Sequence, residues 1–335
     1  MDFLKRYGHF CCFVGMVMLL MACSARKLSK VDQTGVQITQ ADPTIFFHDG
    51  QYYLYGTDGD DAHQGIKVFR SADLENWEEA VGVLDGYALH SRVAYGDRGF
   101  WAPQVWEHAG RFYMAYTANE NIAIASGSSP LGPFAQVEQQ PLIADGKQID
   151  PFIFHDDDGK TYLFHVRLQA GNRIFVAELE DGYRGIVAGT LKECIHAELK
   201  WENTDEVDWP VVEGPTVIKY EGRYYLFYSA NDFRNKQYAV GVAVADKVYG
   251  PWERIGESPL LSMANTHWAG TGHGDVFRND KGWYYICHTH YSDEKVGPRK
   301  TAIVPFAFVH DKNHQIAIPR FDASAFRHLY ARKKE

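Results

Sequence analysis

The chain has 335 residues, of which 45% are hydrophobic and 23% charged, and its formal net charge is −9. This balance is typical of a globular protein with one large domain or two ordinary ones. The acidic charge argues against nucleic acid as the main partner, because binding to phosphates requires clustered Lys and Arg. Aromatic residues make up 14% of the chain, which favours strands, since rings pack well on a pleated surface.

The first segment of the chain has the pattern of a secretion signal. Two basic residues precede an apolar stretch over 10–22, which is short for a membrane-spanning helix. The stretch ends in a small residue directly before Cys23, which resembles a bacterial lipoprotein cleavage site. We therefore expect a signal peptide over 1–22, a lipidated Cys23, a polar tether over 23–38, and a periplasmic or cell-surface location. The alternative is an uncleaved N-terminal anchor.

Two cysteines, Cys194 and Cys287, lie in the rest of the chain. They could form one disulfide or remain as two buried thiols. The spacing of the cysteines matches no zinc-site pattern, and no nucleotide-binding motif appears. We expect no required cofactor.

A repeat runs through the sequence and predicts the fold. Five segments each contain a short apolar strand, a turn with glycine and a second, aromatic-rich strand. Gly at such a turn supplies the positive φ that a tight hairpin needs. The first strands begin at Asp42, Trp101, Asp150, Glu213 and His273. Further strand candidates follow at 66–71, 122–126, 173–179, 238–245 and 301–309.

Each repeat therefore holds about four strands over roughly fifty to sixty residues, the size of a propeller blade. We predict an all-β, five-bladed β-propeller that forms a single domain over 39–335. A β-sandwich would not repeat its sequence in this way, and the rungs of a β-helix are shorter. In a propeller each first strand lines the central channel, and the starts of these strands meet at one mouth.

The residues at the five strand starts are the candidate site. Asp42, Asp150 and Glu213 would converge there with Trp101 and His273, from distant parts of the chain. Carboxyl groups crowded in a partly desolvated site raise one another's pKa. Glycoside cleavage needs this condition, because one acid must stay protonated while a second is ionised.

The ordered motifs resemble glycoside hydrolase family 43 over roughly residues 38–310. They are Ala41-Asp42-Pro43, Trp101-Ala102-Pro103, Ile149-Asp150-Pro151, Glu213-Gly214-Pro215 and Gly272-His273-Gly274. The resemblance implies a general base at Asp42, a pKa-modulating residue at Asp150 and a general acid at Glu213. It also implies inversion at the anomeric carbon, with the two reacting carboxyl groups ~6.5–9.5 Å apart.

Further residues take roles from the same resemblance. Arg299 is expected to reach the substrate or a catalytic carboxylate, and Trp101 to stack on a sugar or to pack between blades. His273 would lie near a structural Ca²⁺ in the channel or be a hydrogen-bonded core imidazole. Gln104 departs from the family, because many relatives carry an acidic residue there; we expect it to affect strand packing or a secondary contact.

The expected function is removal of α-L-arabinofuranosyl or β-D-xylosyl units from plant-type polysaccharides by a monomeric enzyme. A β-xylosidase, an endo-arabinanase or a galactosidase of the same fold are alternatives, as is a non-catalytic glycan-binding propeller. The expected partners are an oligo- or polysaccharide substrate and, through the lipid anchor only, a membrane. A binding propeller would not need three carboxylates at its mouth, which favours the enzyme.

Overall fold

The structure is a computed structural model that describes residues 35–335, apart from 60–61, 80, 257, 312–315 and 333–335. The described residues belong to one compact unit, Gln33–Glu335. The predicted signal peptide and the predicted lipidation site at Cys23 lie outside them. A search of the described part for a helix of sufficient length and apolarity to cross a membrane finds none.

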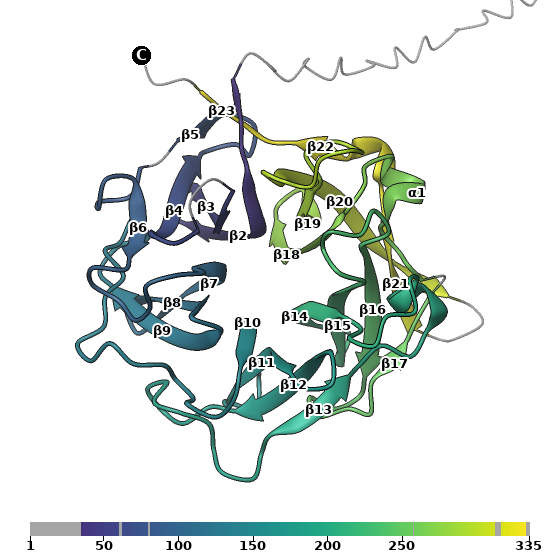
Figure 1. The fold of residues 1–335 in the computed structure, drawn as a ribbon, viewed down its shortest axis with the longest axis horizontal. Coiled ribbons are helices and arrows are strands. Elements are labelled where there is room, and N and C mark those ends of the chain that lie inside the picture. Colours follow the sequence, from purple (N-terminus) through teal and green to yellow (C-terminus); the bar gives the residue numbers. More distant parts are fainter. Residues whose placement is uncertain (1–34, 60–61, 80, 257, 312–315, 333–335) are drawn as a thin grey trace, which may run out of the picture. The chain divides into compact units, whose positions relative to one another are not determined.

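The strands of the described residues form five mainly antiparallel sheets, which stand around a common centre (Figure 1). Sheet I contains β1 (Val36–Gln37), β2 (Gln40–His48), β3 (Gln51–Asp58), β4 (Gly65–Ser71), β5 (Trp77–Glu78), β6 (Tyr87–His90) and β23 (Tyr330–Arg332). Sheet II contains β7 (Trp101–His108), β8 (Arg111–Ala118) and β9 (Asn121–Gly127). Sheet III contains β10 (Gln148–His155), β11 (Thr161–Leu168), β12 (Asn172–Glu178) and β13 (Lys192–Ile195).

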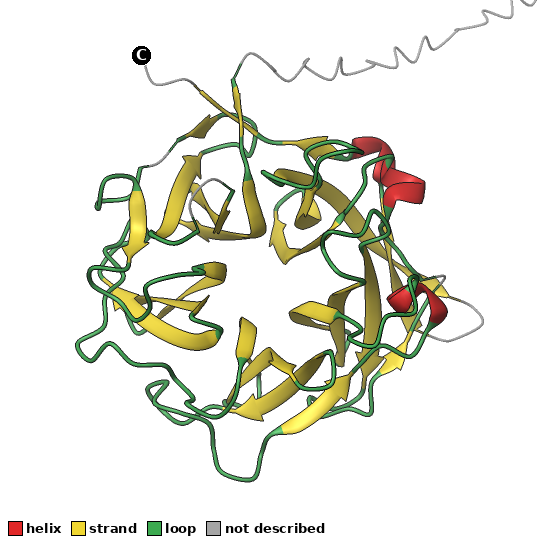
Figure 2. Cartoon of the chain, in the orientation of Figure 1, coloured by secondary structure: helices red, strands yellow, loops and turns green. Residues whose placement is uncertain are grey.

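Sheet IV contains β14 (Val212–Tyr220), β15 (Arg223–Ala230), β16 (Ala239–Ala245) and β17 (Glu253–Arg254). Sheet V contains β18 (Gly272–Asn279), β19 (Gly282–Thr289), β20 (Lys300–Asp311), β21 (Ile316–Phe321) and β22 (Arg327–His328). The helices in the described ranges are the short α1 (Met263–Thr266), η1 (Lys200–Asn203) and η2 (Ala323–Ala325), as Figure 2 shows. The predicted all-β class and the propeller-like arrangement are confirmed.

Each sheet contains one hairpin of the kind that the repeat predicts, namely β2–β3, β7–β8, β10–β11, β14–β15 and β18–β19. The turns contain glycines with positive φ, namely Gly50, Gly110, Gly159, Gly222 and Gly282. A Cβ at any of these five positions would meet nothing within 4 Å. Backbone conformation, and not lack of space, therefore explains glycine at these turns.

Apolar side chains of adjacent sheets meet in five clusters among the described residues. One cluster joins sheets III and IV around Phe164 and Trp252, and another joins sheets V and I around Ile286 and Trp77. The side chains of both tryptophans are buried. Each sheet is thus buried against the next one around the ring, which fixes the relative positions of the strand starts.

The two ends of the described chain close the ring within sheet I. Val36 pairs with Ala331 in an antiparallel bridge between β1 and β23, and β23 pairs in parallel with β5. The expected boundary of the tether at residue 38 is therefore wrong, because Val36–Gln37 is already part of the fold. This strand could not be predicted from its polar sequence, because it forms by pairing with residues almost three hundred positions away.

Sheet II departs from the predicted four strands and has three. The chain after β9 makes only isolated bridges, Ser126 with Ala135 and Leu89 with Phe134. Phe134 is fully buried among side chains of sheets I and II, so this segment contributes packing in place of a strand. Gln104 of β7 joins sheet II to sheet III, because its amide donates to Ile153 O (3.1 Å) and accepts from Ile153 N (2.5 Å). The expected packing role of Gln104 is confirmed.

Candidate active site

The first strand of each hairpin carries a bulge at the same place. The register shifts lie between Ala41 and Thr44 and at the corresponding points of β7, β10, β14 and β18. The residue inside each bulge has a left-handed backbone: Asp42 (φ 47°), Ala102 (φ 44°), Asp150 (φ 56°), Gly214 (φ 61°) and His273 (φ 36°). Bulges of this kind redirect side chains and commonly lie beside active sites.

This register corrects the predicted alignment of the five strand starts. Asp42, Asp150 and His273 are equivalent positions, but Trp101 and Glu213 each lie one residue earlier in the strand. The equivalents of Glu213 are Ala41, Trp101, Ile149 and Gly272. In Ala-Asp-Pro the second residue carries the functional side chain. In Trp-Ala-Pro and Glu-Gly-Pro the first residue carries it.

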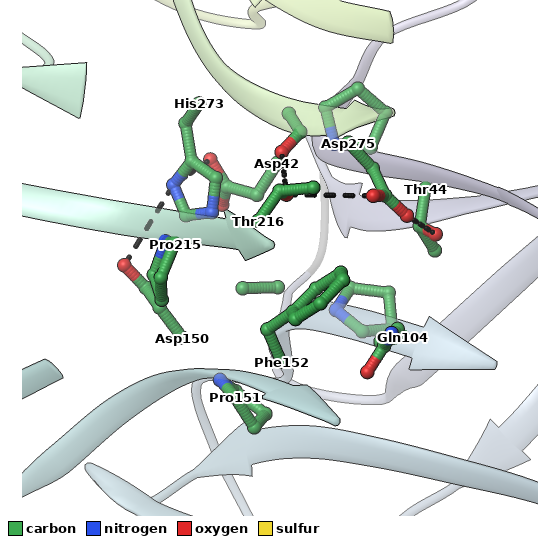
Figure 3. Close-up of a pocket in the computed structure, with 14 residues that line it drawn as sticks. Asp42, Thr44, Gln104, Asp150, Pro151, Phe152, Pro215, Thr216, His273 and Asp275 are labelled. Carbon is green, nitrogen blue, oxygen red and sulfur yellow. Dashed lines mark hydrogen bonds and ion pairs between the residues drawn. The ribbon is translucent and has the colours of Figure 1, made fainter. Parts of the chain in front are cut away.

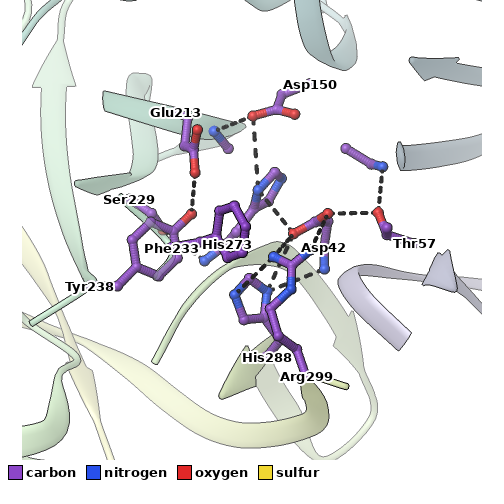
Figure 4. Close-up of polar contacts among 12 residues, drawn as sticks. Asp42, Thr57, Asp150, Glu213, Ser229, Phe233, Tyr238, His273, His288 and Arg299 are labelled. Carbon is purple, nitrogen blue, oxygen red and sulfur yellow. Dashed lines mark hydrogen bonds and ion pairs between the residues drawn. The ribbon is translucent and has the colours of Figure 1, made fainter. Parts of the chain in front are cut away.

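A pocket of about 370 Å³ opens at these bulges. All six residues expected at the mouth line it: Asp42, Trp101, Asp150, Glu213, His273 and Arg299. Figure 4 shows the carboxyl groups turned toward one another around His273. The structure therefore brings together residues of all five sheets, as the repeat predicts.

Asp42 is held in its ionised form by a cation and several donors. Arg299 reaches it with both terminal nitrogens, Nη1 at 2.9 Å from Oδ1 and Nη2 at 3.4 Å from Oδ2, and Thr57 Oγ1 donates to Oδ2 at 2.6 Å. Burial alone would favour the neutral acid, but the positive charge of Arg299 helps to outweigh it. The pKa of Asp42 consequently lies well below its ordinary value.

Glu213 has the opposite character. Tyr238 Oη donates to its Oε1 at 2.8 Å, and Asn172 Nδ2 donates to its Oε2 at 2.9 Å. Burial, reinforced by the negative charge of Asp42, raises the pKa of Glu213 to about 7 against these two hydrogen bonds. Between the low pKa of Asp42 and about 7, the pocket therefore holds an ionised carboxylate and a protonated acid.

His273 and Asp150 are the other two polar residues at the bulges. His273 Nδ1 is 3.3 Å from Asp42 Oδ1 and 3.8 Å from Asp150 Oδ2. Burial lowers the pKa of His273, so the ring is neutral at neutral pH. Its ring packs against Gly214, where a Cβ would lie 2.8 Å from His273 Cδ2. Burial, with the charges of Glu213 and Asp42, raises the pKa of Asp150 well above its ordinary value.

The bulge N–H groups are bound by the preceding sheet. In four sheets, a side chain that stands opposite that sheet's own bulge accepts the N–H of the bulge residue in the next sheet. The pairs are Thr57 with Ala102 (3.1 Å), Thr117 with Asp150 (3.0 Å), Ser229 with His273 (2.8 Å) and His288 with Asp42 (3.2 Å). In sheet III the equivalent residue is Val166, which pairs with Ile149. The side chain of Val166 contains no hydrogen-bond acceptor. There the N–H of Gly214 donates instead to Asp150 Oδ2 at 3.2 Å. Asp150 thus contacts the backbone beside Glu213.

A smaller cavity adjoins the pocket and shares Asp42, Asp150 and His273 with it (Figure 3). Thr44 Oγ1 donates to Asp275 Oδ2 at 2.5 Å within it, and burial raises the pKa of Asp275 to about 6. Nowhere in the described ranges are three His, Cys, Asp or Glu side chains grouped so as to hold a metal ion. Calcium takes about six to eight oxygen ligands, which the residues around His273 do not supply by themselves. The predicted calcium therefore stays a prediction, and no step of the reaction is assigned to it.

Several pocket residues were missed by the sequence reasoning. Thr57 and Ser229 stand opposite the bulges at the ends of second strands, and aligning the five hairpins could have revealed them. His288 stands in the same register. The other missed residues lie outside the repeated hairpins: Asn172, Trp209, Asp232, Phe233, Arg234 and Tyr238.

Replacing Arg299 with Met is expected to raise the pKa of Asp42, because a buried carboxylate loses its cation. A neighbouring Arg typically lowers the pKa of an Asp by about 1–3 units. The acidic limb of kcat/KM against pH, which reports the ionisation of the free base, should therefore move up by about one unit or more. Arg278→Met, at an exposed Arg that stacks on Trp283, is the matched control and should leave the limb in place. An unchanged limb in Arg299→Met would contradict the ion pair.

A glycoside hydrolase requires a pocket that holds an ionised carboxylate together with a carboxylic acid of raised pKa. The comparisons agree with this class. The family described as glycosyl hydrolases family 43 matches residues 35–313, and the chain belongs to it.

Two solved structures and one curated relative illustrate the likeness. The chain is 38% identical to the solved structure of an endo-1,4-beta-xylanase from Bacteroides thetaiotaomicron, with a TM-score of 0.80 over 89% of this chain and 98% of that one. A thermostable family-43 glycoside hydrolase is 32% identical, with a TM-score of 0.76 over 87% and 95% of the two chains. A "xylosidase/arabinosidase" of Butyrivibrio fibrisolvens is 28% identical over 231 residues, 66% of this chain and 44% of the relative. The chain spans about half the length of several such relatives (44% and 46% for two of them).

Proposed function

We propose that the protein is an inverting glycoside hydrolase that removes α-L-arabinofuranosyl or β-D-xylosyl units from plant-type polysaccharides. The observation that carries the proposal is the opposed ionisation of Asp42 and Glu213 in one buried pocket. Relatives named xylosidase/arabinosidase support this choice of sugars. A pocket of about 370 Å³ suits recognition of a terminal sugar unit.

In the proposed mechanism, Asp42 takes a proton from a water molecule that attacks the anomeric carbon. Glu213 gives its proton to the glycosidic oxygen, which leaves as a hydroxyl group. The configuration inverts because the water and the leaving group occupy opposite faces of the sugar. Asp150 holds the backbone of Gly214 and thereby the position of the acid. Arg299 and Trp101 line the pocket where the sugar would bind.

A substrate panel tests the proposal. Purified protein would be incubated with p-nitrophenyl α-L-arabinofuranoside and β-D-xyloside, and with arabinoxylan and linear xylan, and the first anomer released would be followed by NMR. We expect release of a monosaccharide with inverted configuration. A product of retained configuration would overturn the mechanism. Internal cleavage without monosaccharide would favour an endo-acting enzyme, and binding without turnover of any of these glycans would favour a glycan-binding propeller.

We also propose that each of the five sheets is one blade of a five-bladed propeller. The five clusters between successive sheets support this count, since each sheet packs on the next. The three-stranded sheet II is then a blade whose outer strand is replaced by the segment containing Phe134.

Lipid attachment at Cys23, a periplasmic or cell-surface location and a monomeric state complete the proposal. The support for the anchor is the apolar stretch that ends at Ala22-Cys23. Expression in a bacterium fed with a labelled fatty acid should label the native chain but not Cys23→Ala. Cys287→Ser is the control, since Cys287 is a buried free thiol. Equal labelling of native chain and Cys23→Ala would contradict the assignment.

A further inference from the structure

A second cavity, of about 560 Å³, adjoins the catalytic pocket and shares Trp209, Val211, Asp232 and Arg234 with it. We call it the leaving-sugar cavity. Its other walls come from the segments 203–207 and 231–235, which flank β14 and β15 in sequence.

The lining of this cavity has the chemistry that recognises a sugar. Trp209 is 48% exposed and Val207 49% exposed, although both are large apolar side chains. Asn203, Asp205 and Asn235 add amide and carboxylate groups that can exchange hydrogen bonds with hydroxyl groups. An exposed aromatic ring beside such groups is typical of carbohydrate binding, because a ring face packs on the apolar face of a sugar.

Trp209 is also hydrogen-bonded to Asn172, the residue that donates a hydrogen bond to the proposed proton donor Glu213. Its Nε1 donates to Asn172 Oδ1 at 3.0 Å, and Asn172 Nδ2 donates to Glu213 Oε2 at 2.9 Å. An indole N–H can only donate, so Asn172 must turn its oxygen to Trp209 and its NH₂ group to Glu213. The backbone N–H of Asn172 donates to Pro210 O at 2.9 Å, which fixes the loop beside Trp209.

The position of this chain of contacts identifies the side of the pocket on which the cavity lies. Glu213 protonates the oxygen between the released sugar and the rest of the substrate, so the departing part must lie on the Glu213 side. Asn172 and Trp209 occupy that side, and the leaving-sugar cavity begins at Trp209.

We propose that the leaving-sugar cavity binds the sugar next to the cleaved bond, and that Trp209 couples this binding to the proton donor through Asn172. The inference rests on the proposed function and adds a specificity-determining and positioning residue to it. A sugar stacked on Trp209 fixes the indole, which holds the amide of Asn172 in the orientation that donates to Glu213.

The groups facing Glu213 decide the sign of the effect. Asp42 of β2, Asp150 of β10 and Asp232 after β15 are acidic, Arg234 is basic, and His273 of β18 is a neutral ring nearby. Tyr238 and Asn172 are the hydrogen-bond donors, and both stabilise the ionised form of Glu213. Loss of the Asn172 bond therefore favours the protonated acid and moves the basic limb of kcat to higher pH.

Two substitutions at Trp209 separate its two roles. Trp209→Phe keeps a ring but removes the N–H, so Asn172 is free to turn; we expect the basic limb of kcat to rise by about one pH unit, with little change in KM. Trp209→Ala also removes the ring, and should raise KM for a disaccharide by about tenfold. For the glycosyl fluoride of the same sugar, which has no leaving sugar, KM should stay unchanged. Asn172→Ala should reproduce the pH shift without the change in KM.

The matched control is Trp283→Phe at the start of β19, where the ring packs against Phe306 and Phe308. It should leave the pH profile and both KM values as in the native protein. Unchanged profiles and KM values in the Trp209 variants of an active enzyme would overturn this inference alone. Absence of turnover of all substrates by the native protein would overturn the proposed function, and this inference with it.

Discussion

Asp42→Asn is expected to lower kcat by roughly 10²–10⁴-fold, the usual contribution of a positioned general base. The amide is nearly isosteric but cannot accept the proton of the attacking water. It also removes the charge that pairs with Arg299 across 2.9 Å. The measurement is kcat on the substrate that the native protein turns over fastest, at a pH below about 7 where Glu213 stays protonated.

Chemical rescue distinguishes a lost base from a damaged fold. In Asp42→Ala, added azide should attack the anomeric carbon in place of water and restore part of the rate, because azide needs no base. The product should be a glycosyl azide of inverted configuration. Asp85→Asn, at an exposed residue, should leave kcat unchanged. Native turnover by Asp42→Asn would show that another group activates the water.

Glu213→Gln is expected to show a loss of activity that depends on the leaving group. For a sugar leaving group, which departs as a poor anion unless protonated, kcat should fall by roughly 10²–10⁴-fold. For a dinitrophenyl glycoside, whose anion departs without a proton, the fall should be much smaller. The new amide keeps an oxygen for one of the bonds from Tyr238 and Asn172, so the pocket should retain its shape.

The pH profile provides the second measurement for the same variant. In the native enzyme kcat should fall as the pH rises through about 7, because Glu213 loses the proton that it must give to the leaving group. This basic limb should be absent from the Glu213→Gln profile on the dinitrophenyl substrate. Glu253→Gln, at an exposed position of β17, should keep the limb. Equal losses for both leaving groups would argue against Glu213 as the proton donor.

The repeat allowed the all-β class, the hairpins and the convergence of Asp42, Asp150 and Glu213 to be predicted. These depend on short-range signals, namely turn glycines and alternating apolar residues, which recur in each sheet. The one-residue offset of Trp101 and Glu213 could not be predicted from the sequence. The bulge changes the direction of adjacent side chains without changing the spacing of the residues along the chain.

Contacts that depend on the closed ring also escaped prediction. The strand Val36–Gln37 exists through its pairing with β23, and Trp209 reaches Glu213 only through Asn172 of another sheet. In both cases the contact joins residues that are far apart in sequence and outside the repeated hairpins, Val36 with Ala331 and Asn172 with Trp209. A repeat describes what its units share, whereas the specificity of a site depends on where they differ.

The left-handed backbone of the bulge residues creates a conflict between thermal stability and catalysis. A residue other than glycine adopts such angles at a cost of about 1–2 kcal/mol, and Asp42, Ala102, Asp150 and His273 all do so, with Gly214 alone avoiding it. The simplest relief of this strain is glycine, which at three of the four positions would delete a carboxyl or imidazole group from the pocket. Selection for thermal robustness alone would therefore tend to erase the activity, and Ala102 is the position in this ring where the two demands do not conflict.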